Sequence, residues 1–116
     1  MLMLAAFAPA RAADCTQPST ERYEPRSFLG YACEDDCQRH KAGFAWAERE
    51  AVTEAVECTP LAPPEAEGCL AYLQERLTPE QAGLRWAVEN EIAVPCLCGG
   101  AGNDFRAGCL RYAAGP

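Results

Sequence analysis

The stretch that decides the fold is residues 41–72, which begin KAGFAWA and end GCLAY. Residues 81–112 begin QAGLRWA and end GCLRY, so the two stretches match at an offset of 40 residues without a gap. The shared positions include an alanine–glycine pair, a tryptophan, two cysteines and a tyrosine. A repeat of this length is typical of a structural unit that packs against its own copy. The sequence therefore predicts two tandem units, residues 41–72 and residues 81–112.

Each unit has the pattern of two helices joined by a loop. The first helix is expected over residues 35–50, because apolar and long side chains recur there at helical spacing. Four residues follow this spacing: Ala42, Ala45, Trp46 and Arg49. Gly43 and Ala47 are four residues apart, so they share a face and would let another helix approach closely. A loop punctuated by prolines follows, and the second helix is expected to begin near Pro64, since proline is tolerated in a first turn.

The second unit carries the clearest local signal for a helix start. Thr78 can cap the helix, Pro79 fits its first position, and Gln81 completes a capping box. This third helix is expected to end near Glu91, and a last helix is expected over residues 104–113 with Asn103 as its cap. No segment has the pattern of a strong strand. The predicted fold class is therefore all-α, with two tandem helix–loop–helix units of period 40.

The N-terminus indicates export. Residues 1–8 are apolar, and Ala10-Arg11-Ala12 is a small-residue cleavage pattern, so residues 1–12 are predicted to be a signal peptide. Residues 13–116 then form a single cysteine-rich helical domain, with a lead-in whose apolar end, Phe28, Leu29 and Tyr31, is expected to pack on the body. The predicted location is the periplasm or the extracellular space.

Eight cysteines in a short exported chain are typical of a disulfide scaffold. Equivalent cysteines of the two units should have equivalent partners, which predicts the bridges Cys58–Cys69 and Cys98–Cys109. The remaining four are expected to pair among themselves: Cys15, Cys33, Cys37 and Cys96. A bridge from the Cys33/Cys37 pair to Cys96 would tie the two units together.

The charge restricts the partners. The net charge is −7, and it would become −8 once Arg11 is removed with the signal peptide. Nucleic acids and anionic lipids are bound through cationic side chains, so neither is expected as a partner. The apolar run at the N-terminus is too short to span a bilayer. A protein partner with basic groups would fit this chain.

The cysteines and the single histidine allow two chemical alternatives to a scaffold. Cys33, Cys37 and His40 could ligate zinc, with Cys96 or Cys98 as a fourth ligand. A redox pair could be formed by Cys96 and Cys98, or by Cys33 and Cys37. Disulfide bonding is the favoured interpretation, because exported thiols are usually oxidised. No catalytic residue, metal site or cofactor is therefore assigned.

Three further features have a structural interpretation. His40 is expected to be a solvated or hydrogen-bonded helix residue rather than a general base. The loop GGAGND at residues 99–104 resembles one copy of a calcium repeat, but turns and capping explain its glycines. Four aromatic residues at equivalent positions are expected in the core: Trp46, Trp86, Tyr72 and Tyr112.

Residues 33–48, CEDDCQRHKAGFAWAE, resemble a known pattern. The form C-x-x-D-C-x-x-H-x-A-G-x-x-W-A-E, followed by G-C-x-x-Y, is similar to that of small exported bacterial proteins of unknown function. The resemblance covers roughly residues 33–72 and implies a bacterial origin, with no activity attached. The second unit departs from the pattern, because Leu73, Leu77 and Glu80 stand where the first has Cys33, Cys37 and His40.

Taken together, these features predict an exported, disulfide-stapled helical protein that acts as a non-enzymatic binding module. The alternative is a small periplasmic protein with thiol-redox or metal-binding activity.

Overall fold

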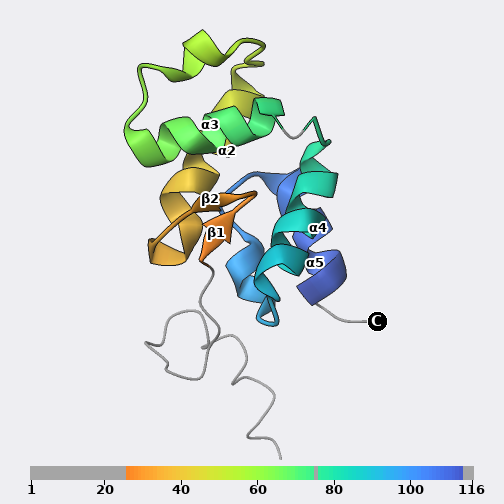
Figure 1. Ribbon diagram of the computed structural model, residues 1–116. Coiled ribbons are helices and arrows are strands. Elements are labelled where there is room, and N and C mark those ends of the chain that lie inside the picture. The colour runs from red at the N-terminus through yellow and green to blue at the C-terminus, as the bar shows by residue number, and fades with distance from the viewer. Residues whose placement is uncertain (1–25, 75, 114–116) are drawn as a thin grey trace, which may run out of the picture.

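The computed structural model describes residues 26–74 and 76–113. Within these ranges the chain forms a short β-hairpin followed by two pairs of α-helices (Figure 1). The helices are α2 (Gln38–Arg49), α3 (Pro63–Gln74), α4 (Pro79–Asn90) and α5 (Asn103–Ala113). The predicted all-α class is confirmed. The predicted signal peptide, residues 1–12, and Cys15 lie outside the described residues.

Shorter elements connect the helices. The hairpin consists of two antiparallel strands, β1 (Ser27–Phe28) and β2 (Tyr31–Ala32). Three 3-10 helices precede α2, α3 and α5, and they are η2 (Asp35–Cys37), η3 (Ala55–Cys58) and η4 (Pro95–Cys98). None of the helices in the described part of the chain has the length and apolar character needed to cross a membrane.

Helix boundaries follow the local signals of the sequence. The Thr78 hydroxyl accepts a hydrogen bond from the Gln81 amide at 3.1 Å, and the Gln81 side chain accepts one from the Thr78 amide at 3.0 Å. This is the predicted capping box, and it satisfies two backbone donors at the start of α4. Pro63 likewise begins α3, one residue before the predicted start.

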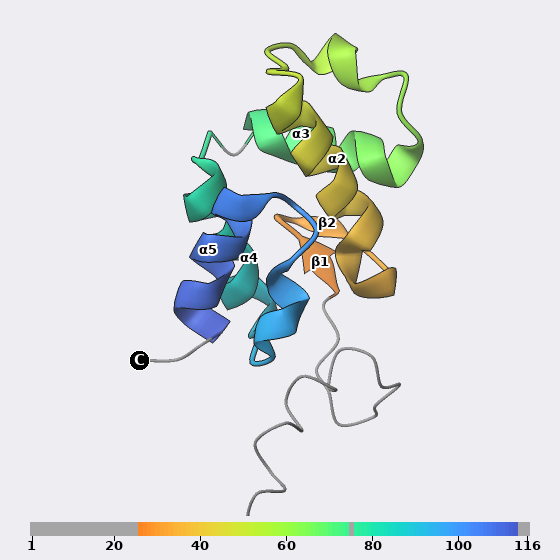
Figure 2. The ribbon, with the colours of Figure 1, turned by 180° about the vertical axis from the view of Figure 1, so that it is seen from behind.

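Glycines set the distance between the two helices of each pair. Four of them lie so close to the partner helix that a side-chain carbon would overlap a backbone carbonyl. The contacts are Gly43 to Glu65, Gly68 to His40, Gly83 to Phe105 and Gly108 to Glu80. Within each pair, the contacting residues follow one another in opposite order along the two helices. Figure 2 shows α3 lying across α2, and α5 beside α4. The contacts of the second pair fall 40 positions after those of the first, the same offset as the sequence match.

The hairpin joins the two helix pairs into one core. Phe28 of β1 is fully buried, with its ring centroid 5.8 Å from that of Phe44 in α2 and 5.7 Å from that of Phe105 in α5. Trp86 of α4 lies 5.8 Å from Phe105 in the same cluster. Rings at these distances add attraction beyond the area that they bury. The apolar end of the lead-in therefore packs on the body, as predicted.

The buried face of the first helix includes Gly43 and Ala47, and α3 approaches it closely at Gly43, as predicted. The residues that α2 buries are His40, Lys41, Gly43, Phe44 and Ala47. Ala42 is exposed, and Trp46 is only half-buried, against a smaller cluster that contains Val52. The four residues that follow helical spacing in the sequence therefore do not form the main buried face. The predicted aromatic core is also only partly right, since Trp86 is fully buried whereas Tyr112 is 39% exposed.

Two disulfides hold a 3-10 helix to the helix that follows it. Cys58 of η3 is bonded to Cys69 of α3, and Cys98 of η4 is bonded to Cys109 of α5. The Cα–Cα distances are 5.8 Å and 5.5 Å. These are the pairs that equivalence between the units predicts, and each closes a loop whose ends are 11 positions apart.

Candidate functional site

A cavity of about 370 Å³ opens between the segment after β2, the first turn of α2 and the start of α3. Among its lining residues are a disulfide cysteine, Cys33, and four side chains with polar groups, Glu34, Arg39, His40 and Glu67. The close approach at Gly68 brings α3 against the backbone of His40, and it thereby places Glu67 beside α2. This cavity combines polar side chains with a chemically reactive group, the Cys33 disulfide, at its wall.

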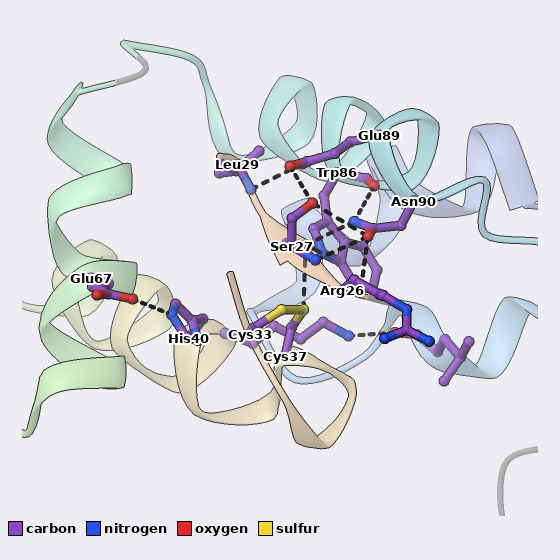
Figure 3. The surroundings of a disulfide bond; sticks show 12 residues. Arg26, Ser27, Leu29, Cys33, Cys37, His40, Glu67, Trp86, Glu89 and Asn90 are labelled. Carbon is purple, nitrogen blue, oxygen red and sulfur yellow. Dashed lines mark hydrogen bonds and ion pairs between the residues drawn. A yellow bond between two sulfur atoms is a disulfide. The ribbon is translucent and has the colours of Figure 1, made fainter. Parts of the chain in front are cut away.

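The disulfide at this cavity joins Cys33 to Cys37 across a tight turn (Figure 3). Its Cα–Cα distance is 5.1 Å. Asp36 has φ 60° and Cys37 has φ 65°, so two successive non-glycine residues adopt the left-handed conformation. This reversal of the chain turns the Cys37 sulfur back toward Cys33. Cys33 is half-buried, whereas Cys37 is fully buried at the residue preceding α2.

The predicted bridge from the Cys33/Cys37 pair to Cys96 is therefore wrong. The two cysteines bond to each other, because the left-handed turn closes a separation of four residues more directly than any distant pairing could. Cys96 is itself disulfide-bonded. The proposed pairing of Cys96 with Cys98 is wrong as well, since Cys98 is bonded to Cys109.

His40 and Glu67 form a pair at the cavity wall. The His40 Nε2 atom lies 2.7 Å from the Glu67 Oε1 atom, and His40 is 4% exposed. The histidine is hydrogen-bonded, as expected, but it is buried rather than solvated. Beside this pair, the Arg39 guanidinium donates to Glu65 at 3.1 Å. This hydrogen bond lowers the pKa of the Glu65 carboxyl.

The turn of the disulfide is connected to α4 through the backbone of Ser27. The Ser27 carbonyl accepts hydrogen bonds from the Trp86 indole and from the Asn90 amide, both at 2.8 Å. The Cys37 sulfur lies 3.3 Å from the same oxygen. Asn90 also accepts from the backbone amides of Arg26 and Ser27, at 3.0 Å and 3.2 Å. One buried asparagine thus fixes the strand that passes over the disulfide (Figure 3).

Glu89, next to Asn90, holds the tip of the hairpin. Its two carboxylate oxygens accept hydrogen bonds from the Leu29 and Gly30 amides, both at 2.9 Å, and from the Ser27 hydroxyl at 2.6 Å. Leu29 has φ 51° and Gly30 has φ 97°, so both central residues of this turn are left-handed. Leucine adopts this conformation at a cost of about 1–2 kcal/mol. The carboxylate offsets that cost, because it orients both amides.

Lys41 is the second buried polar residue of α2. Its ammonium donates to the carbonyls of Leu97 and Gly99 and lies 4.1 Å from the centroid of the Trp86 ring. Burial lowers the pKa of Lys41 to about 8, although the nearby Asp36 carboxylate opposes this shift. The side chain therefore cross-links the first helix pair to the loop of the second.

A second cavity, of about 400 Å³, is apolar and lies between η3 and α3. We call it the η3 groove, and its lining includes Ala55, Val56, Ala66 and Leu70. Val56 is 65% exposed, which makes it the most exposed large hydrophobic residue in the described part of the chain. Apolar side chains in the open beside an apolar depression are typical of an interaction surface.

The residues considered as metal or calcium ligands have other roles in the structure. Cys33 and Cys37 are bonded to each other, so neither offers a thiolate to a metal while the bridge is intact. Across residues 26–74 and 76–113, no group of three or more potential ligand side chains is placed to hold a metal ion. In the glycine loop, Gly100 and Gly102 have φ values of 107° and 100°, which supports the turn interpretation. The Gly99 carbonyl is occupied by the Lys41 ammonium.

Four residues of these sites could not be identified from the sequence: Lys41, Glu67, Glu89 and Asn90. One signal was available for Lys41, since the second unit has glutamine at the equivalent position and a lysine within an otherwise apolar helix face needs partners. The partners of the other three lie on segments whose proximity depends on tertiary packing.

Comparison of the chain with protein-family models, with curated proteins and with solved structures found no match.

Proposed function

We propose that the protein is an exported, disulfide-stapled binding module built from two copies of one helical unit, and that the η3 groove is its binding surface. The apolar N-terminus of the sequence and the disulfides of the described part both support export to an oxidising compartment. The observation that carries the proposal is Val56, which stands 65% exposed at the edge of an apolar groove of about 400 Å³.

The second unit supplies a comparison within the same chain. The residue equivalent to Val56 is Cys96, which is disulfide-bonded. The residue equivalent to Glu57 is Leu97, which is buried. Cys96 is itself exposed, but its sulfur is committed to a disulfide, and Leu97 belongs to the core, whereas Val56 and Glu57 are both exposed. A surface kept open at one of two otherwise similar sites is consistent with a contact to another molecule.

The charge around the η3 groove indicates the kind of partner. Glu50, Glu54 and Glu57 are all exposed on the segment that leads into and forms η3. Their carboxylates would attract Lys or Arg at the edges of a bound segment, while the groove would take an apolar side chain. The proposed ligand is therefore a segment of an exported protein with an apolar residue flanked by basic residues.

The test is selection from a random peptide library on the purified, oxidised protein. Enriched peptides should combine an apolar centre with Lys or Arg, and their affinity should fall as salt is raised. Val56→Ser should weaken them by about fivefold to tenfold, which corresponds to roughly 1–1.4 kcal/mol for an interface anchor. Val88→Ser is the matched control, because Val88 is 51% exposed and lies on α4, away from the η3 groove.

Equal affinity for wild type and Val56→Ser would contradict this assignment, as would enrichment of acidic peptides. Loss of binding in the Val88→Ser control would place the surface on α4 instead.

A further inference from the structure

We propose that the Cys33–Cys37 disulfide is redox-active and exchanges with thiols of another exported protein, whereas Cys58–Cys69 and Cys98–Cys109 are structural. This inference is independent of the binding function of the η3 groove. It rests on the access to one sulfur, on the backbone conformation of the turn, and on the position of Cys37 at the start of α2.

Access distinguishes this bridge from the other two. Thiol–disulfide exchange requires a thiolate to reach a sulfur atom of the bridge. Cys33 is half-buried and lines a cavity of about 370 Å³. All four sulfur-bearing residues of the other two bridges are buried: Cys58, Cys69, Cys98 and Cys109. A thiolate can therefore approach Cys33. Cys58 also lines a cavity, the η3 groove, but it is only 2% exposed, and the other three cysteines of the structural bridges are fully buried.

The wall of the cavity is also polar. It includes one guanidinium, of Arg39, and two carboxylates, of Glu34 and Glu67, so an approaching reactant meets polar groups rather than an apolar surface. Cys37 lies on the opposite side of the bridge, fully buried against the hairpin. The attack is thereby directed to the Cys33 sulfur.

The turn that the bridge closes favours its opening. Asp36 and Cys37 both hold left-handed backbone conformations that cost non-glycine residues free energy. Once the bridge opens, the turn is free to relax, and the reduced form gains from this release. Conformations of this kind that persist in a folded protein are often located at functional sites.

Cys37 is suited to be the leaving group. It occupies the N-cap position of α2, a helix of 12 residues, where its side chain makes no capping hydrogen bond in the disulfide form, and the positive end of a helix dipole stabilises a thiolate. A sulfur that leaves as a stabilised thiolate leaves faster. The Ser27 carbonyl, 3.3 Å from the Cys37 sulfur, can then accept a hydrogen bond from the thiol once that sulfur is protonated.

The exchange proceeds in two steps. A substrate thiolate attacks the Cys33 sulfur, a substrate–Cys33 bond forms, and the Cys33–Cys37 bond breaks. A second thiolate of the substrate then attacks its own sulfur in this mixed disulfide, which releases Cys33 and leaves the substrate with a disulfide. Two electrons and, through the solvent, two protons pass from the substrate dithiol to Cys33 and Cys37. The reduced pair is re-oxidised by a disulfide of another exported protein.

The first experiment uses the unmodified protein. The oxidised mature chain is incubated in graded dithiothreitol without denaturant, alkylated, and examined by peptide mass spectrometry. Cys33 and Cys37 should be alkylated at a dithiothreitol concentration at least about tenfold lower than Cys58, Cys69, Cys98 and Cys109 require. Reduction of all these bridges in one step, or of Cys33–Cys37 last, would overturn the proposal.

A second experiment identifies the attacked sulfur. Cys37→Ser leaves a thiol at Cys33, and Cys33→Ser leaves a thiol at Cys37. With glutathione disulfide as the probe, the Cys37→Ser protein should form a mixed disulfide at least about tenfold faster than the Cys33→Ser protein, because only Cys33 lines the cavity. Equal rates, or a faster reaction at Cys37, would refute the assigned order of attack. Helix content, measured by circular dichroism, must be the same in both variants.

Discussion

Lys41 gives the sharpest test of how the two helix pairs are held together. It is the only lysine in the sequence and is 0% exposed, with its ammonium between the Leu97 and Gly99 carbonyls. Burial lowers its pKa from the usual 10.5 to about 8. In the unfolded chain the same amine is solvated and keeps its ordinary value. The folded protein therefore gives up the proton of Lys41 at a lower pH than the unfolded chain does.

The sign of the pH dependence follows from this difference. Between about pH 8 and pH 10.5 the unfolded chain binds more protons than the folded protein, so the free energy of unfolding rises with pH. The contribution of this residue should make the protein about 2 kcal/mol more stable at roughly pH 9.5 than at pH 7, at up to about 1.4 kcal/mol per pH unit. Below pH 8 the amine is protonated in both states, and its contribution becomes constant.

The assay is urea denaturation of wild type and Lys41→Met across this range. Methionine fills a similar volume and does not titrate, so the stability difference between the two proteins isolates the amine. That difference should grow in favour of wild type by about 2 kcal/mol between pH 7 and pH 9.5. An amine-reactive reagent offers a second readout, because folded protein should be labelled only at its N-terminal amine. Parallel pH curves, or rapid labelling of Lys41 in the folded protein, would refute the reasoning.

Two further predictions concern the scaffold. Gly43→Ala should lower the free energy of unfolding by about 2 kcal/mol, because its new methyl group would overlap the Glu65 carbonyl. Gly99→Ala is the control and should change this free energy by less than about 0.5 kcal/mol, because no atom lies within 4 Å of the added carbon. Equal effects of the two substitutions in urea denaturation would contradict the close helix approach. Asn90→Ala should lower the free energy of unfolding by about 3 kcal/mol and speed hydrogen exchange at the Ser27 amide, because the backbone amides of Arg26 and Ser27 lose their acceptor. Unchanged exchange at Ser27 would show that the hairpin is held by other contacts.

The parts of the fold that could be predicted are those determined by neighbouring residues or by the sequence match between residues 41–72 and 81–112. The capping box at Thr78 and the prolines fix helix starts through neighbouring residues, so α3 and α4 begin where the sequence places them or one residue away. The bridges Cys58–Cys69 and Cys98–Cys109 followed from the repeat, because equivalence of positions reduces the number of pairings.

The hairpin and the site could not be predicted, since their determinants are distant in sequence. Two residues per strand leave no alternating pattern, and the hairpin is held by a side chain 63 positions away, Asn90. His40 was expected to be solvated or hydrogen-bonded, because polar side chains are usually exposed, and no burial was predicted for Lys41. Their burial is possible only because Glu67 and the carbonyls of the η4 loop supply partners, and neither partner can be recognised before the helices are packed.

The differences between the two helix pairs are informative because their scaffold positions agree. The glycines at which the helices of each pair approach each other recur 40 positions apart, and so do the cysteines of Cys58–Cys69 and Cys98–Cys109. Other positions differ between the two units. The residue equivalent to His40 is Glu80, that equivalent to Lys41 is Gln81, and that equivalent to Val56 is Cys96. Each of these three residues of the first unit has a role in the structure. His40 lines the disulfide cavity, Lys41 donates to a carbonyl of the η4 loop, and Val56 lines the η3 groove.

Replacing one of them by its counterpart, for example His40→Glu, should leave the Gly68 contact intact while it places a carboxylate opposite Glu67. If the first unit carries the function, these exchanges should alter disulfide exchange or peptide binding more than they alter helix content. If disulfide exchange and peptide binding decline only when helix content declines as well, the residues that differ between the two units serve packing alone.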